Sequence, residues 1–102
     1  MAADYRLSLA AAADFQSIGR YTQHHWGVDQ RRAYLADLVA AVERLAADVH
    51  LGRSRDDIRQ GLLSYPCGSH VIFFRRRADR PEIVRILHGR QSLERAFGEG
   101  GP

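Results

Sequence analysis

Apolar and polar residues follow two different periods along the chain. Between Tyr5 and Leu9 every second residue is apolar, which predicts a short half-buried strand. From about residue 11 to residue 26 the apolar positions recur three or four residues apart, which predicts a helix that Gly27 ends. Asp29 is the predicted N-cap of a second helix, and the two helices form a hairpin. The second helix has an apolar seam made of Leu35, Leu38, Val42, Leu45 and Val49.

A period of two returns after residue 52. It predicts three successive strands at residues 60–67, 70–77 and 82–88, with turns at 66–68 and 78–81. Ser92 fits the N-cap of a short helix that ends at Phe97, and residues 98–102 are predicted to be a frayed tail. The order β-αα-βββ(-α) predicts one α+β domain over residues 1–102. Its mainly antiparallel sheet has the helical hairpin packed on one face.

The other face of this sheet has no predicted cover. Two helices shield only one face, so the second face meets solvent, a ligand or a partner. Residues 71–74, VIFF, are all apolar, so both faces of the central strand are apolar. This favours a protein partner on the uncovered face. The sequence does not determine which residues of this strand face outward, because a bulge at Gly68 or Gly89 would reverse the two faces.

Composition narrows the class of protein. The 102 residues have a net charge of +3 and a pI near 9.6, less basic than a dedicated nucleic-acid binder, and we expect no sequence-specific nucleic-acid binding. All 15 basic residues are arginines, which excludes lysine chemistry such as Schiff-base formation. Cys67 is the single cysteine, and we expect no disulfide, metal or cofactor. No apolar run approaches the ~20 residues that span a bilayer, so we expect a soluble cytoplasmic protein without a membrane partner.

The segment IVRILHGRQ, residues 83–91, and the strand before it hold the candidates for chemistry. His70 and His88 lie on adjacent predicted strands and are expected to approach each other, as the best catalytic or metal-binding pair. Cleavage of RNA through its 2′-hydroxyl needs a base, a cation and an acid. Arg90 with either histidine fills two of these roles, and no acid is evident. We therefore expect no enzyme, with His70, His88 and Arg90 as the alternative catalytic set.

Three blocks of the chain resemble the ParE-type toxins of the RelE/ParE superfamily, which belong to bacterial type II toxin–antitoxin systems. These blocks are YRLSLAAAADF, GRSRDDIRQGLLSYPCGSHVIFFR and IVRILHGRQSLERAF. The resemblance implies the β-αα-βββ fold and a toxin that arrests growth, stabilises plasmids and is neutralised by a cognate antitoxin. ParE-type members inhibit DNA gyrase by stabilising its cleaved-DNA state, whereas RelE-type members cut messenger RNA on the ribosome.

The resemblance also bears on which activity to expect. The ribonuclease members have an arginine at the position of His70, another at Arg90, and a tyrosine near Ala96 or Phe97. Arg90 alone matches this set, and the ring of Phe97 cannot transfer a proton. We therefore expect a gyrase inhibitor. The alternatives are a RelE-type ribonuclease and a non-toxic member that only binds its antitoxin.

The same resemblance suggests which residues meet gyrase. The expected contacts are made by Arg59, Arg85, His88, Arg90 and Phe97. For Arg59 and Arg90 an ion pair within the chain is an equal alternative. The acidic partners considered for these ion pairs are Asp56, Asp57 and Glu94.

The antitoxin is expected to bind elsewhere on the molecule. Its apolar anchors would meet Ile72 and Phe74 on the uncovered sheet face, and its acidic residues would pair with Arg76. The outer face of the helical hairpin is a further candidate surface. The expected assembly is a toxin–antitoxin hetero-oligomer.

Overall fold

The computed structural model describes residues 4–78, 80–89, 91 and 93–98, apart from the Glu94 side chain. Its elements are β1 (Arg6–Leu7), α1 (Leu9–Trp26), α2 (Val28–Ala47), β2 (Arg53–Ser54), β3 (Leu63–Cys67), β4 (His70–Arg77), β5 (Arg80–His88) and α3 (Leu93–Phe97). The α+β prediction is confirmed, and β2 is an additional strand. None of the helices within the described residues could cross a lipid bilayer. Residues 99–102 of the predicted tail lie outside the described residues.

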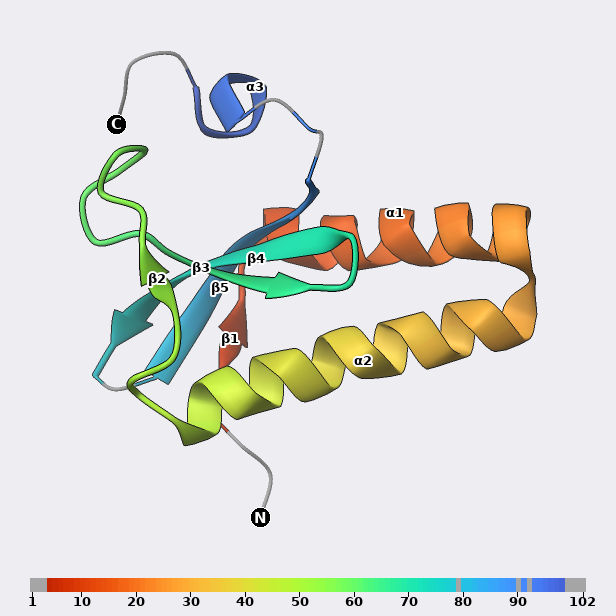
Figure 1. The fold of residues 1–102 in the computed structure, drawn as a ribbon, viewed down its shortest axis with the longest axis horizontal. Coiled ribbons are helices and arrows are strands. Elements are labelled where there is room, and N and C mark those ends of the chain that lie inside the picture. Colours follow the sequence, from red (N-terminus) through yellow and green to blue (C-terminus); the bar gives the residue numbers. More distant parts are fainter. Residues whose placement is uncertain (1–3, 79, 90, 92, 99–102) are drawn as a thin grey trace.

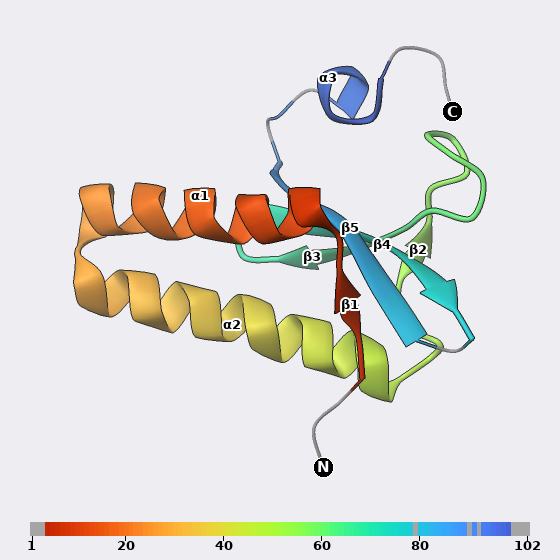
Figure 2. The ribbon, with the colours of Figure 1, turned by 180° about the vertical axis from the view of Figure 1, so that it is seen from behind.

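The strands form one mixed sheet in the order β1-β5-β4-β3-β2. The predicted meander of β3, β4 and β5 is confirmed, and β1 adds a parallel pair at the β5 edge. Figure 1 shows α1 and α2 as an antiparallel hairpin whose turn reaches past the sheet, with α3 apart from that hairpin. The view from behind in Figure 2 also shows the helical hairpin extending past the sheet.

The N-terminal strand is shorter than predicted. β1 contains only Arg6 and Leu7, because Ser8 already caps α1 by accepting a hydrogen bond from the Ala11 backbone N–H at 2.9 Å. Leu9 lies in the first turn of α1 and is 93% exposed, so the predicted half-burial of this position is wrong. An alternating pattern over only five residues does not show where a strand ends and a helix begins.

A single glycine joins the two helices of the hairpin. Gly27 has a φ of 96°, a conformation that favours glycine, and it is both the C-cap of α1 and the N-cap of α2. The prediction that Asp29 caps α2 is therefore wrong. Asp29 lies in the first helical turn, where its charge suits the helix dipole. At the other end α2 stops at Ala47, so Val49 of the predicted seam lies outside the helix and is exposed.

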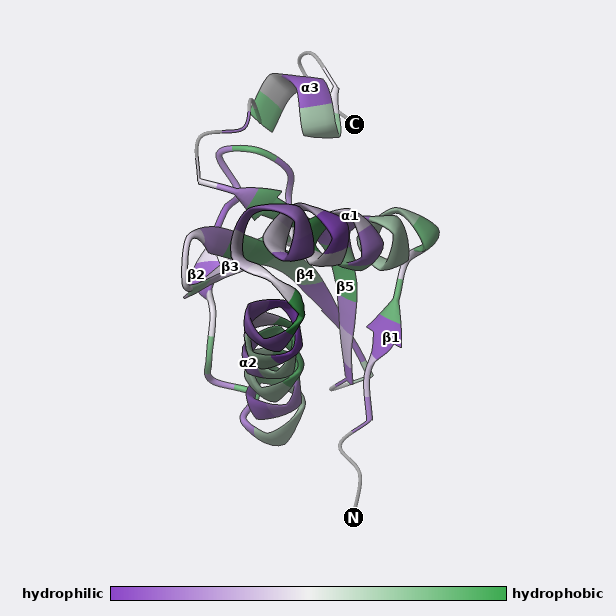
Figure 3. Cartoon of the chain, turned by 90° about the vertical axis from the view of Figure 1, so that its right-hand side faces the viewer, coloured by the Kyte–Doolittle hydropathy of each residue, from purple (hydrophilic) through white to green (hydrophobic). Residues whose placement is uncertain are grey.

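The main core lies between the hairpin and the sheet. Leu38, Val42 and Leu45 of the predicted seam are buried there, and Leu35 is half-buried beside them. Each such buried side chain contributes about 1.5–3 kcal/mol of hydrophobic stabilisation. Figure 3 shows the hydrophobic stretches of β4 and β5 where these strands pass α1. The strands supply Ile72, Phe74, Ile83 and Ile86 to this core.

The other face of the sheet is covered, in contrast to the prediction. A second cluster joins Phe73 and Leu87 of the strands to Leu62 and Phe97. The loop at residues 55–62 and helix α3 supply this cover. Short segments of the same chain thus cover the apolar sheet face that was predicted to be available to a partner.

The residues of β4 that were predicted to bind the antitoxin face the helical hairpin. Ile72 and Phe74 have 0% exposure and pack beneath the hairpin, while Phe73 belongs to the second cluster. The prediction that Ile72 and Phe74 form an exposed docking face is therefore wrong. Because four consecutive residues of this strand are apolar, the sequence alone did not determine which two would point toward the helices.

One bulge interrupts the pairing of β4 with β5. Phe73 pairs with Arg85, but Phe74 pairs with Ile83, so Val84 is the extra residue in β5. Neither glycine that was considered for a bulge lies at this position.

Candidate functional site

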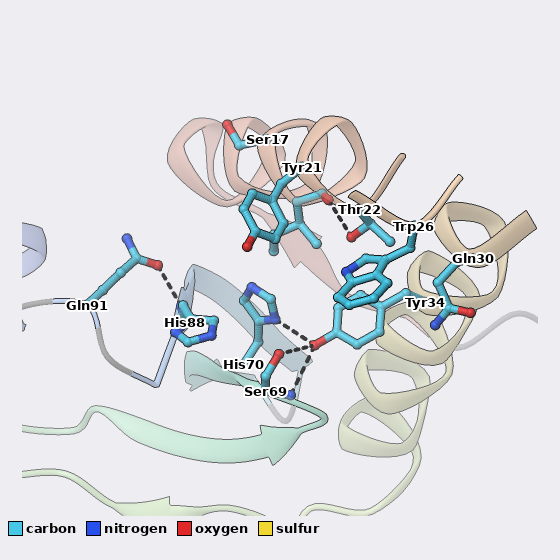
Figure 4. Close-up of a pocket in the computed structure, with 11 residues that line it drawn as sticks. Ser17, Tyr21, Thr22, Trp26, Gln30, Tyr34, Ser69, His70, His88 and Gln91 are labelled. Carbon is cyan, nitrogen blue, oxygen red and sulfur yellow. Dashed lines mark hydrogen bonds between the residues drawn. The ribbon is translucent and has the colours of Figure 1, made fainter. Parts of the chain in front are cut away.

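A pocket opens where the helical hairpin meets the ends of β4 and β5. Its volume is about 650 Å³, and helices α1 and α2 form its walls while the β3–β4 turn and the last residue of β5 form its floor. Figure 4 shows Tyr21, Trp26, Tyr34, His70 and His88 around this opening. The pocket therefore combines aromatic walls with a polar floor, as many ligand sites do.

The two strand histidines meet at the floor of the pocket. His70 and His88 are paired directly across the antiparallel ladder. Their rings are 5.4 Å apart between centroids and perpendicular to each other. The prediction that they approach each other is confirmed, because residues opposite each other in a ladder bring their side chains together.

The hydroxyl of Tyr34 ties the helical wall to this floor. It lies 2.6 Å from His70 Nδ1 and 3.2 Å from the backbone nitrogen of Ser69. A backbone N–H can only donate, so the Tyr34 oxygen accepts from Ser69. The acceptors within reach of the Tyr34 hydroxyl include Nδ1 of neutral His70 and the Cys67 carbonyl at 3.4 Å. Gly68 leaves room for this contact, since a Cβ there would lie 2.8 Å from the Tyr34 hydroxyl.

Burial favours the neutral form of His70. Desolvation lowers the pKa of this ring below its ordinary value of 6.5, and the neighbouring His88 lowers the pKa further, while Asp14 opposes both effects. His70 thus places a ring that favours the neutral form at the floor of the pocket.

The segment after β5 turns back on the strand end. The Gln91 side-chain oxygen accepts from the His88 backbone N–H at 2.6 Å, and Gln91 also lines the pocket. Arg90, predicted both as a contact residue and as part of the alternative catalytic set, lies outside the described residues. His88 lines the pocket and is exposed.

Three residues predicted to contact gyrase instead hold α3 on the sheet. Arg59 donates a short hydrogen bond to the Phe97 carbonyl and places its guanidinium 5.3 Å from the centre of the Phe97 ring. Phe97 is only 4% exposed and packs edge-on against Phe73, so its prediction as a surface contact is wrong. Arg85 donates to the Ala96 carbonyl at 3.4 Å. These contacts are made within the chain.

An ion pair within the chain was one of two alternatives for Arg59. Of the partners considered, Asp57 pairs with Arg55, and Asp56 accepts from the backbone N–H of Gly61. Arg85 forms a bidentate ion pair with Asp14 of α1, with N–O distances of 2.8 and 3.0 Å. This hydrogen bonding raises the pKa of Arg85. The Glu94 side chain, also considered as a partner, lies outside the description.

Arg76 has a structural role at the end of α2. Its guanidinium donates to the carbonyls of Leu45, Asp48 and Leu51 at 2.9–3.1 Å and lies 5.2 Å from the centre of the Phe74 ring. Carbonyls at a helix C-terminus lack partners within the helix, and an arginine satisfies them well. Arg76 is thus engaged within the chain, and its pairing with an antitoxin stays a prediction.

The aromatic walls are the part of the site that sequence reasoning missed. Tyr34 lies four residues before Leu38, so the helical spacing of the seam could have assigned it to the inner side of α2. Trp26 follows Thr22 by four residues and so fits the helical face predicted for residues 11–26, whereas Tyr21 was not among the positions of that face. Within the described residues, no group of three or more His, Cys, Asp or Glu side chains could hold a metal ion.

The arrangement of the elements defines the class of fold. A solved structure described as the chromosomal ParDE TA system from P. aeruginosa superimposes with a TM-score of 0.73 over 83% of this chain and 94% of that chain, at 21% identity. The chain therefore has the RelE/ParE-like fold.

The sequence comparisons give the family. The family model of the ParE toxin of the type II toxin–antitoxin system, parDE, matches residues 5–93. Toxin ParE1 of Mycobacterium tuberculosis is 40% identical over 96 residues, which are 93% of this chain and 98% of that protein. Toxin ParE of Escherichia coli is 37% identical over 90 residues, or 87% of each chain. The chain belongs to the ParE toxin family of type II toxin–antitoxin systems, as its motifs predicted.

Proposed function

We propose that this ParE-family toxin inhibits DNA gyrase by binding the enzyme and stabilising its cleaved-DNA state. A cognate antitoxin neutralises it in the cytoplasm. The observation that carries the proposal is the family match over residues 5–93. Such a toxin needs no catalytic group, because gyrase itself cleaves the DNA and the toxin has only to favour one state of the enzyme.

The geometry of the pocket supports binding. Tyr34 is hydrogen-bonded to Nδ1 of His70, and burial lowers the pKa of this histidine. No guanidinium or carboxylate lines the pocket within the described residues. Of the residues predicted to contact gyrase, His88 is exposed at the end of β5, and Arg90 follows it by two positions in the chain. We assign the gyrase contact to this end of β5.

One observation favours the ribonuclease alternative. His70 and His88 meet in a pocket that also contains two tyrosines, so a base and an acid are close together. The charge that would stabilise a cleaved phosphate depends on Arg90. This alternative predicts cleavage of messenger RNA on ribosomes by the purified chain.

A cleavage assay distinguishes the two activities. Purified protein is incubated with gyrase, ATP and supercoiled plasmid, and the reaction is stopped with detergent and protease. The proposal predicts accumulation of linear DNA that depends on both gyrase and the toxin. Intact plasmid together with ribosome-dependent cutting of messenger RNA would overturn it.

A pair of histidine variants tests the assigned contact. We expect His88→Ala to reduce linear DNA at least about fivefold, the effect of losing an interface contact worth about 1 kcal/mol. His50→Ala is the matched control, since His50 is also exposed but follows α2, away from the pocket. Equal activity of both variants would exclude the end of β5 as the contact.

The antitoxin has its own test. The short reading frame beside the gene is expressed together with this chain, and growth and co-purification are measured. The proposal predicts that the neighbouring protein restores growth and elutes in a complex with the toxin. A neighbour that does neither is not the antitoxin.

A further inference from the structure

The pocket walls present aromatic rings whose faces are open to solvent. Trp26 is 71% exposed and Tyr21 is 61% exposed, although both line the same cavity as the half-buried Tyr34. Figure 4 shows Tyr21 above the two histidines and Trp26 and Tyr34 beside them. Aromatic side chains of this kind stack with the bases of nucleic acids, at about 1–3 kcal/mol for each base.

Tyr21 is held in place as a wall of the pocket. Its ring stacks on His25 with 3.9 Å between centroids, and His25 in turn packs edge-on against His24 at 5.1 Å. The stack with His25 covers one face of the Tyr21 ring, and Tyr21 lines the pocket. A preorganised ring loses little conformational entropy when a second ring stacks on it.

The polar groups of the pocket suit a ligand with a polar edge. Gln30, Ser69 and Gln91 line the cavity together with His70. An apolar side chain of a protein partner would bury these groups without hydrogen bonds, at a cost of about 1–3 kcal/mol for each unsatisfied group. A planar ring with donors and acceptors along its edge avoids that cost.

A cation lies close to the lining but outside the cavity. Arg20 does not line the pocket; it is exposed on α1, and its guanidinium is 3.4 Å from the hydroxyl of the lining residue Ser17. A phosphate that extends from the ligand beyond the cavity along α1 would meet this positive charge. The cavity of about 650 Å³ falls within the range of small-ligand sites and has room for a base and its sugar.

From these contacts we propose that the pocket binds an unpaired nucleobase that carries a phosphate, from either a free nucleotide or single-stranded DNA. The base stacks on Tyr21 and Trp26, its edge meets His70, and the phosphate meets Arg20. Stacking accepts every base, so this agrees with the expected absence of sequence-specific recognition. The inference does not depend on gyrase as the target.

Trp26 provides the measurement, because it is the only tryptophan in the chain. Its fluorescence is followed while the full chain is titrated with thymidine monophosphate, with a short oligothymidylate, and with a blunt DNA duplex. Saturable quenching by the mononucleotide and the oligonucleotide supports a site for free nucleotides, and quenching by the oligonucleotide alone supports a strand site. No quenching, or equal quenching by the duplex, would overturn the proposal.

Variants separate base stacking from charge. We expect Tyr21→Leu to weaken binding at least about fivefold, whereas Tyr21→Phe retains it because the ring is unchanged. Arg20→Ala should weaken binding and reduce its salt dependence. Arg53→Ala is the matched control, because Arg53 is equally exposed but lies in β2, away from the α1–α2 turn in Figure 1.

Two results keep this inference distinct from gyrase inhibition. Unchanged oligonucleotide binding by a correctly folded Tyr21→Leu variant would overturn the nucleobase site and leave gyrase inhibition standing. Base binding by a chain that never traps cleaved DNA would overturn the gyrase proposal alone. Thermal unfolding of each variant verifies that the fold is intact.

Discussion

The α1–α2 hairpin and helix α3 cover opposite faces of the same sheet in different ways. Among the described residues, ten buried side chains join the hairpin to its face, whereas four form the cluster under α3. Arginines compensate for the smaller cluster: Arg59 and Arg85 donate to the carbonyls of Phe97 and Ala96 at the end of α3. One cover is stabilised by apolar area and the other by a few polar bonds.

This difference has a consequence for local stability. Segments with few buried apolar contacts open more readily than the core, because opening exposes less surface. We therefore expect the α3 cover to detach at a lower free energy than the hairpin. Arg85 connects the two regions, since it also pairs with Asp14 of α1. The following predictions test this contrast, from the largest effect to the smallest.

Truncation of a ring on each face gives the largest contrast. Phe74→Ala leaves a cavity beneath the hairpin and is expected to lower the free energy of unfolding by about 3–5 kcal/mol. Phe97→Ala is expected to cost less, because α3 can detach without unfolding the rest. Urea denaturation measures both values. Equal losses would show that the two faces form one cooperative unit.

Two ion pairs with different burial give the next effect. Asp14 accepts from Arg85 and from the Ile86 backbone N–H, and its side chain is only 15% exposed. Asp14→Asn should lower the free energy of unfolding by about 2 kcal/mol, because it leaves Arg85 without its charged partner. The matched variant Asp57→Asn breaks the exposed pair with Arg55 and should cause no measurable change. A similar loss in both variants would contradict this account.

The difference between the two sheet faces also explains which parts of the structure could be predicted from the sequence. The spacing of Leu38, Val42 and Leu45 predicted the hairpin seam, and strand periodicity predicted that His70 would meet His88. Burial under α3 was not predictable, because a five-residue helix has too few positions to show a period. The arginine roles were also missed, since a bond from Arg to a backbone carbonyl has no acidic partner to identify in the sequence.

Removal of one polar bond should loosen α3 alone. Arg59→Ala eliminates the hydrogen bond to the Phe97 carbonyl and the contact with its ring. We expect amide exchange in the C-terminal peptide to accelerate about tenfold, the effect of losing one charged hydrogen bond. Arg53→Ala, at an exposed position in β2, is the control. Exchange that accelerates equally in α2 would mean that Arg59 stabilises the whole fold.

The smallest expected effect is the pH dependence of stability that arises from His70 in the pocket. The pKa of His70 is lowered in the folded state by burial and by His88, so the unfolded chain binds more protons between the folded pKa and 6.5. The contribution of His70 to stability is therefore complete above 6.5 and is lost as the pH falls through its folded pKa. Urea midpoints measured between about pH 5 and 8 should decrease toward acid, and the slope should be smaller in His70→Gln. An unchanged slope in that variant would assign the pH dependence to another group, and the neutral state of the pocket floor would lose its support.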